Sequence, residues 1–342
     1  MITLAFFNNK GGVGKTTLVY HVACMLAEMG VKTLAVDLDP QANLTSAFLN
    51  ESALEGLWDR GASTILSAVG PILEGTGDIA TISAPEVRDG LFLIGGDLGL
   101  SRFEDRLSGS WSNGFMGDPA ALRVTSAFHR VIRQTGDRLG AEVALMDVGP
   151  NLGAINRASL LAADHLLIPL AADLYSLQGL RNLGPTIREW RDVWKRTLSN
   201  ANVQFSLPVG TMSPIGYVVL QHAVRLDRPV KAYKKWLDRI PLEYKMSVLG
   251  QKLDTTQKVA LPDTNCLASL RNYRSLMPLA QDARKPMFDL KPADGAIGSH
   301  SQYVQTCYEE FRGLTKSILG RIQSNRRETP SVIVNEQPPN LR

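Results

Sequence analysis

Short apolar runs alternate along the chain with longer stretches in which apolar residues recur every three or four positions. Residues 2–7 form an apolar run, residues 8–14 are rich in glycine, and residues 16–29 have helical spacing. Gly30 follows as a natural helix-terminating residue. Together with a second apolar run at 33–36, these segments make one βαβ unit. Because the same alternation continues, we predict an α/β fold with a doubly wound, mostly parallel sheet flanked by helices.

Further apolar segments extend this alternation along the chain. Residues 108–119 (SGSWSNGFMGDP) interrupt it, because they are rich in Gly, Ser and Asn but also carry Trp111, Phe115 and Met116. We expect a loop insertion there, whose aromatic residues either pack locally, the interpretation we favour, or form a partner-binding site. We expect helices at 63–69, 98–107, 120–139, 155–163, 176–198, 229–240 and 301–323, and strands at 79–83, 91–94, 142–146, 165–170 and 215–220.

Length and composition fit one large α/β domain. Of the 342 residues, 44% are hydrophobic and 20% charged, which excludes a disordered or fibrous protein. We assign residues 1–323 to a single domain and residues 324–342, which are polar and hold three prolines, to a disordered tail. Charged residues and a proline interrupt the apolar stretch at 160–174, and the first residues do not resemble a secretory signal. We therefore expect a cytoplasmic protein.

Charge is distributed unevenly between the two halves of the chain. Residues 1–150 hold 11 Lys and Arg against 17 Asp and Glu, a net charge of −6. Residues 151–342 hold 26 against 16, a net charge of +10. A basic region of this size attracts polyanions such as nucleic acid or an anionic membrane, and charge alone does not choose between them.

The run KGGVGKTT lies between the first strand and the first helix, where a phosphate-binding loop must lie. Its three glycines allow backbone N–H groups to point at an anion. We expect Lys15 to reach the β and γ phosphates of a nucleotide, and the Thr16 hydroxyl to ligate Mg²⁺. The run departs from the strict motif, because Asn9 stands at the first glycine and Lys10 is an additional lysine. The candidate nucleotide-binding residues are Lys10, Gly11, Gly12, Val13, Gly14, Lys15, Thr16 and Thr17.

Acidic residues follow two strands of the same predicted sheet. Asp37 and Asp39 end the second strand in the segment DLDPQAN, and Asp147 ends the strand at 142–146. Ligands of doubly wound folds bind at the carboxyl ends of parallel strands, so these carboxylates are expected near the phosphate loop. An apolar strand that ends in Asp is the Walker B arrangement, in which the carboxylate holds Mg²⁺, usually through water.

Together these motifs resemble the ParA/MinD (Soj-like) family of deviant Walker A ATPases. The resemblance rests on KGGVGKTT, on DLDPQAN, and on DVGPNLGAINRASLLAADHLLIPLAADLYSLQGLRNL at 147–183. It covers residues 1–50 and 140–200 most closely, and more loosely the rest, including 273–278. It implies a P-loop ATPase that uses ATP and Mg²⁺ and dimerises face to face, with two ATP molecules between the subunits.

The resemblance also implies roles for individual residues. Lys10 is expected to contact the nucleotide of the opposite subunit, where it neutralises charge on the transferred phosphoryl group. Asp39 is expected to help position the attacking water. Gly149 replaces one of two prolines that usually follow the Walker B aspartate, which predicts a looser loop. The implied catalytic residues are Lys10, Lys15 and Asp39, the implied magnesium ligands Thr16, Asp37 and Asp147, and the implied phosphate contact Thr17.

The family divides by the surface on which its members act. ParA-like members bind DNA without sequence specificity, whereas MinD-like members bind lipid through a C-terminal amphipathic helix. The prolines within 324–342 prevent such a helix, so we expect no membrane binding. A basic cluster around the helix predicted at 229–240 either contacts DNA phosphates or is a solvated face, and the two interpretations are equally balanced. Its residues are Arg225, Arg228, Lys231, Lys234, Lys235 and Arg239.

The leading prediction is an ATP-dependent homodimer that binds non-specific DNA, associates with the nucleoid, and positions or segregates DNA or another cargo. A ParB-like or adaptor partner would stimulate its ATP hydrolysis. The alternative is a protein-directed regulatory or assembly switch without DNA binding, in which the segment at 108–119 recognises a protein. A metallocluster enzyme is less well supported, because the three cysteines supply no evident pair. Gln221 is our candidate for a nucleotide-base contact.

Overall fold

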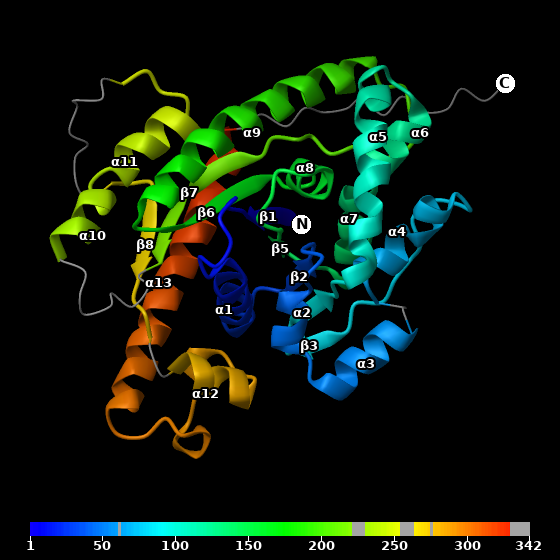
Figure 1. Ribbon diagram of the computed structural model, residues 1–342. Helices are drawn as coiled ribbons and strands as arrows, with labels where there is room; N and C mark the ends of the chain where they lie inside the picture. The colour runs from blue at the N-terminus through cyan, green and yellow to red at the C-terminus, as the bar shows by residue number, and fades with distance from the viewer. Residues whose placement is uncertain (61–62, 221–229, 254–262, 274–275, 329–342) are drawn as a thin grey trace.

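One eight-stranded sheet runs through the part of the chain that the computed structural model describes, namely residues 1–60, 63–220, 230–253, 263–273 and 276–328 (Figure 1). The strand order is β3-β4-β2-β5-β1-β6-β7-β8, and every neighbouring pair is parallel except β3 with β4. The predicted α/β fold with a mostly parallel sheet is therefore confirmed. The strands are β1 (Ile2–Phe6), β2 (Thr33–Asp37), β3 (Glu86–Arg88), β4 (Leu91–Ile94), β5 (Val143–Asp147), β6 (His165–Ala171), β7 (Ser213–Leu220) and β8 (Cys266–Leu270).

Helices flank the sheet on both faces (Figure 1). Short 3₁₀ segments occur at η1 (Leu98–Arg102), η3 (Met287–Asp289) and η4 (Pro292–Asp294), and a π-helical turn at η2 (Tyr244–Val248). The α-helices are α1 (Lys15–Glu28), α2 (Asn43–Phe48), α3 (Glu51–Arg60), α4 (Ile65–Glu74), α5 (Phe103–Phe115), α6 (Pro119–Thr125), α7 (Ala127–Leu139), α8 (Ala154–Leu161), α9 (Leu174–Asn200), α10 (Val230–Leu237), α11 (Ile240–Glu243), α12 (Leu276–Ala283) and α13 (Ser299–Glu328).

Each face of the sheet has its own apolar core, because side chains alternate between the two faces of a strand. Leu4 and Phe6 of β1 pack with α1, α12 and α13. Ala5 and Phe7 point the other way and pack with α4, α7, α8 and α9. The central strands are mostly apolar, as expected for strands covered on both sides. Because these strands are parallel, their carboxyl ends lie at the same end of the sheet, which is where the acidic residues were predicted.

The prediction of a loop insertion at 108–119 is wrong. Helices α5 and α6 cover most of this segment, with a turn around Gly117 between them. The buried residues of α5 are Phe103, Leu107 and Gly114, and half-buried Trp111 packs against the same core, so the four lie on one face of the helix. Its ring is nearly parallel to that of Trp194 in α9, with centroids 6.3 Å apart. This packing outweighs the low helix propensity of Gly and Ser. It also removes the exposed aromatic loop on which the alternative function depended.

The C-terminal helix is longer than predicted. Helix α13 extends to Glu328, so residues 324–328 are helical and do not belong to a disordered tail. Residues 329–342 lie outside the described residues. The helix docks on the core through an apolar face, as its spacing predicted. This face contains Cys307, Phe311, Leu314, Ile318 and Ile322.

The strand predicted at 79–83 is also wrong. One edge of the sheet is formed by β3, which runs antiparallel to β4. Ile82 is buried in the core although it belongs to no strand, so the apolar character of this segment reflects core packing. The other predicted strands coincide with β1, β2 and β4 to β7 apart from small shifts at their ends, whereas β3, β8, α2, α3 and α12 were not predicted. In the described ranges, none of the helices is both long and apolar enough to cross a membrane.

Candidate functional site

The glycine-rich loop after β1 has the conformation of an anion cradle. Gly12 and Gly14 have φ angles of +71° and +86°, which a side chain would disfavour. Gly14 directly precedes α1, so the N–H groups of the first helical turn face the loop. Asn8 anchors the loop at its start: its Nδ2 donates to the Pro169 carbonyl (2.7 Å), and its Oδ1 accepts the Lys10 N–H (3.1 Å). A phosphate group is the ligand that such a loop favours.

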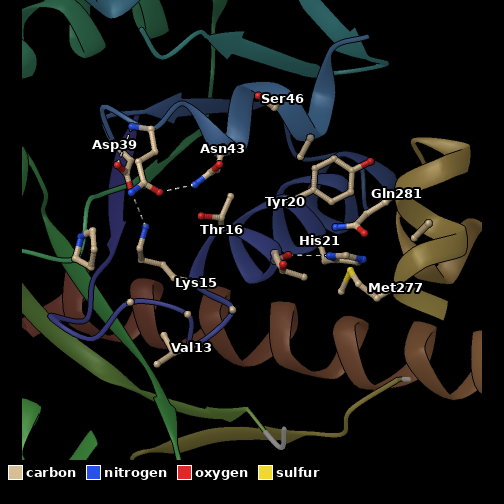
Figure 2. A pocket seen from close by; sticks show the side chains of 18 of the residues that line it. Val13, Lys15, Thr16, Tyr20, His21, Asp39, Asn43, Ser46, Met277 and Gln281 are labelled. Atoms are coloured by element: carbon tan, nitrogen blue, oxygen red, sulfur yellow. Dashed lines mark hydrogen bonds and ion pairs between the residues drawn. The ribbon is translucent and has the colours of Figure 1, made fainter. Parts of the chain in front are cut away.

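A buried cluster of charged and hydroxyl groups lies beside this loop. Lys15 forms an ion pair with Asp147, and its Nζ is 4.0 Å from Asp39 Oδ2. The Thr16 hydroxyl donates to the second carboxylate oxygen of Asp147 at 2.7 Å. Burial raises the pKa of the Asp147 carboxyl, and the Lys15 ammonium opposes this rise. The structure thus brings together the predicted Lys15, Thr16, Asp39 and Asp147. Figure 2 shows the first three of them.

Asp37 lies next to this cluster but faces a different partner. It pairs with Asp147 across β2 and β5 in the sheet register. Its Oδ2 accepts both the N–H (2.8 Å) and the hydroxyl (2.7 Å) of Thr45 in α2. Full burial, and then the neighbouring Asp147 charge, raise the pKa of Asp37 to about 7. In the structure Asp37 therefore fastens α2 to the end of the sheet, and its predicted contact with magnesium stays a prediction.

The oxygen atoms of the cluster suit a magnesium ion. In the described residues, no group of three or more His, Cys, Asp and Glu side chains is placed to hold a metal on its own. Mg²⁺ needs no such cage, because it usually takes one or two protein oxygens and completes its shell with water and phosphate. The Thr16 hydroxyl and the Asp147 carboxylate, already within hydrogen-bond distance of each other, supply such oxygens.

Lys10, the additional lysine, is held by its own chain. Its ammonium forms an ion pair with Asp173, the residue that caps α9. It also lies 5.7 Å from the ring centroid of Tyr175, a side chain that is 72% exposed. Although burial acts in the opposite sense, the hydrogen bonds from Lys10 and Ser176 hold the pKa of Asp173 below its usual range. Sequence reasoning did not identify Asp173, because it is 163 positions from Lys10.

A cavity of about 740 Å³ extends from the phosphate loop between α1 and α12 (Figure 2). Its size and position suit the nucleoside part of a ligand whose phosphates occupy the loop. Asp39, Gly12 and Thr17 lie in its wall as predicted, whereas Gln221 lies outside the described residues. The loose resemblance at 273–278 was the only signal for the α12 side. Further lining residues not predicted include Tyr20, His21, Asn43, Ser46, Met277, Gln281 and Arg284.

His21 links the phosphate-loop helix to the C-terminal segment. Its Nε2 accepts the Met287 N–H at 3.0 Å, so its proton is on Nδ1, which donates to the Thr17 carbonyl at 2.7 Å. Complete burial lowers the pKa of His21 to about 4, and the ring stacks on Phe311 of α13. His21 is therefore a neutral structural residue behind the phosphate loop.

The predicted basic cluster is described only in part. Lys234 and Lys235 are exposed on α10, and Arg239 is exposed just after it. The Lys235 and Arg239 charges lie over the ring of Trp236, 5.3 and 5.4 Å from its centroid. Arg225, Arg228 and the side chain of Lys231 lie outside the described residues. A contact between these basic residues and DNA stays a prediction.

The fold, the two-lysine phosphate loop and the strand-end aspartate define a P-loop domain of the deviant Walker A class. The chain belongs to the ParA/MinD (Soj-like) family of such ATPases, and a family model described as an AAA domain matches residues 1–200. The chromosome-partitioning ATPase Soj of Thermus thermophilus is 33% identical over 188 residues, 55% of this chain and 62% of Soj. Protein IncC of Escherichia coli is 31% identical over 208 residues, 60% of this chain and 49% of IncC. The chain thus spans about half to two thirds of the length of these relatives.

Solved structures share the fold over nearly the whole chain. The complex of Cyanothece McdA with ATP has a TM-score of 0.60 and 18% identity, and covers 93% of this chain and 96% of McdA. The ParA protein of pNOB8, bound to non-specific DNA, has a TM-score of 0.55 and 20% identity, and covers 95% of this chain and 99% of ParA. At these identities the likeness concerns the fold.

Proposed function

We propose that this chain is a dimerising ATPase that binds non-specific DNA in its ATP state and positions or segregates DNA or another cargo. The observation that carries this proposal is the cluster of Lys15, Thr16 and Asp147 between a glycine cradle and a cavity of nucleoside size. Relatives named as partition ATPases, and a fold neighbour with bound ATP, support it.

The resting ion pair at Lys15 sets the first step of nucleotide binding. When a phosphate chain enters the loop, its oxygens compete with Asp147 for the Lys15 ammonium. Asp147 and the Thr16 hydroxyl would then be the groups that hold Mg²⁺, with Asp37 beside them at the adjacent strand end. When bound, Mg²⁺ neutralises charge that develops on the phosphate oxygens. Met277 and Gln281 in α12 are placed to meet the nucleoside.

Asp39 is the residue we assign to the attacking water. It lies in the cavity wall, in contrast to the fully buried Asp37 and Asp147. Its backbone N–H is 3.3 Å from Asp37 Oδ1, and its own Oδ1 accepts the Gln41 N–H at 3.0 Å, which fixes the direction of the carboxylate. A carboxylate so held can orient a water molecule toward the terminal phosphate.

Lys10 is the residue we assign to the partner subunit's nucleotide. In the single chain its ammonium is bound to Asp173, whereas that of Lys15 is bound to Asp147. Face-to-face dimerisation over ATP would exchange this ion pair for a phosphate contact across the interface. A second positive charge then arrives only in the dimer, so hydrolysis depends on assembly.

DNA is the polyanion that we expect to bind the basic half of the chain. Lys234, Lys235 and Arg239 present positive charge to solvent. A fold neighbour bound to non-specific DNA supports this part of the proposal. The protein would then act on the nucleoid in the cytoplasm, and a ParB-like or adaptor protein would stimulate hydrolysis.

The decisive experiment measures binding of the Asp39→Ala variant to non-specific duplex DNA with ATP, with ADP and without nucleotide, over a salt series. We expect ATP to be retained without turnover, and DNA to be bound in the ATP state alone with strong salt dependence. Lys15→Ala is the matched control, because it should lose ATP and therefore DNA. Equal DNA binding in all three states, or none in any, would contradict the proposal.

A further inference from the structure

The loop that follows Asp147 is the part of the nucleotide site whose support is least obvious. We call residues 148–153 the switch loop. Pro150 in this loop lines the cavity. A Cβ atom placed on Gly149 would lie 3.6 Å from the carboxyl carbon of Asp39, so the loop runs beside the carboxylate assigned to the attacking water. Any shift of the loop therefore changes the surroundings of Asp39.

One side chain of α8 holds the switch loop in place through hydrogen bonds. Asn156, which is fully buried in the first turn of α8, donates through Nδ2 to the Gly149 carbonyl (3.0 Å) and the Asn151 carbonyl (2.7 Å). Its Nδ2 is also 2.8 Å from Asn151 Oδ1. The positions of these two loop carbonyls therefore depend on the position of the first turn of α8.

The start of α8 is in turn fixed by a residue of another helix. The residue before α8 is Gly153, which has no side chain with which to cap the helix. Glu104, in the first turn of α5, supplies the cap. Its Oε1 accepts the Ala154 N–H (2.5 Å) and its Oε2 accepts the Ile155 N–H (2.8 Å). A carboxylate is the favoured partner for the free N–H groups and the positive dipole end of a helix.

A second contact holds α5 and α8 together about one turn further along. The guanidinium of Arg157 in α8 lies 4.0 Å from the ring centroid of Trp111 in α5, and 5.9 Å from that of Trp190 in α9. Such a partly buried cation over aromatic rings is attractive. Helix α5 is therefore attached to α8 at two points, and its helical structure is what places Glu104 and Trp111 on the same side.

We propose that Glu104 is a positioning residue for ATP hydrolysis, acting through α8 and Asn156 on the switch loop. This inference depends on the proposed ATPase function and identifies a further residue that the same site needs. Asn8 anchors the phosphate loop to β6, and α1 packs against α2 and α13. Glu104 therefore affects turnover and leaves nucleotide affinity unchanged. Helix α5, far from the phosphate loop in sequence, thereby becomes part of the hydrolytic machinery.

The test compares Glu104→Ala and Glu104→Gln with Asp105→Ala, which removes an exposed carboxylate from the same turn of α5. We expect Glu104→Ala to lower kcat about fivefold to tenfold while the Kd of a non-hydrolysable ATP analogue stays within about twofold. Glu104→Gln keeps one acceptor oxygen and should lose less, and Asp105→Ala should match the natural chain. Turnover by Glu104→Ala at the rate of Asp105→Ala would overturn the proposal, as would an equal loss of nucleotide affinity.

Hydrogen exchange of the switch loop separates this inference from the proposed function. In nucleotide-free protein, Glu104→Ala should speed amide exchange at residues 149 and 151–153 as well as at the start of α8, relative to Asp105→Ala. Exchange unchanged in the loop would overturn the link through Asn156. If the natural chain binds and hydrolyses no ATP, the proposed function fails, and the exchange measurement still shows whether Glu104 supports the loop.

Discussion

At the scale of single residues, His21 shows how strongly the fold depends on one uncharged side chain. A proton can bind Nε2 only if the hydrogen bond from the Met287 N–H breaks. Between the ordinary pKa of 6.5 and the lowered value of about 4, the unfolded chain binds a proton that the folded chain does not. The free energy of unfolding should therefore fall as the pH is lowered through this range, by up to about 3 kcal/mol from this group.

Urea unfolding between about pH 7 and pH 5 measures this effect when the natural chain is compared with His21→Gln. The variant keeps a polar side chain but cannot titrate, so its stability should depend less steeply on pH. The remaining titratable groups are common to both proteins and cancel in the difference. Parallel pH profiles would show that His21 does not contribute.

Asp173 is the residue that sets how easily Lys10 leaves its own chain. Its carboxylate also caps α9 by accepting the Ser176 N–H at 2.8 Å. Asp173→Asn retains an oxygen for the cap and removes the charge that holds Lys10. Because this ion pair is about 30% exposed, we expect ATP-dependent dimerisation at about two- to fivefold lower protein concentration.

Light scattering over a concentration series with ATP measures this shift. Asp173→Ala is the control for the cap: it should free Lys10 equally but also lower the thermal stability. An unchanged or higher dimerisation concentration for Asp173→Asn would contradict the assignment of Lys10 to the partner's nucleotide.

Which site residues the sequence could predict follows from how each is placed. Lys15 and Thr16 follow the glycine loop directly, and Asp147 ends a strand beside β1, so local pattern and strand adjacency sufficed. Glu104 and Asp173 could not be predicted, because each acts on a segment far away in the chain. Contacts of this kind are set by the packing of helices, which hydrophobic periodicity does not specify.

At the scale of elements, α5 gives a direct test of helix against loop. Gly109 lies in the helix, and a Cβ atom there would meet nothing within 4 Å. Gly109→Ala should therefore stabilise the protein by about 0.5–1 kcal/mol. Gly117 lies in the turn with φ +84°, and a Cβ atom there would be 2.7 Å from the Asn200 carbonyl oxygen. Gly117→Ala should destabilise by about 1 kcal/mol or more.

Chemical denaturation of the two variants measures the difference. A loop without fixed structure at 108–119 would tolerate both substitutions with little change in stability. Either that result or destabilisation by Gly109→Ala would contradict the helix. The pattern of α5 was present in the sequence as the spacing between Leu107 and Trp111. The many Gly and Ser residues nevertheless favoured a loop in our prediction. Their low helix propensity is overcome in the structure by stacking of Trp111 on Trp194.

At the scale of the whole molecule, the division of charge predicts where DNA is bound. Replacing Lys234 and Lys235 with Glu should make the slope of log K for DNA against log salt less steep, by about 0.9 for each lost phosphate contact. ATP turnover without DNA should not change. Lys32→Glu, at an exposed lysine of the acidic half, is the control and should leave the slope as it is. Equal slopes for the natural chain and both variants would show that the α10 lysines face solvent and do not contact DNA.

The central position of β1 has a consequence for the order in which the protein is made. β1 lies between β5 and β6, and α1 is fastened through His21 to a segment near the other end of the chain. A ribosome that adds roughly 5–20 residues per second delivers Met287 well after the phosphate loop. The nascent chain therefore displays the nucleotide motif early but cannot hold it in shape until much later. Incomplete chains should therefore not bind nucleotide stably, and the proposed ATP cycle should begin only in a nearly finished chain.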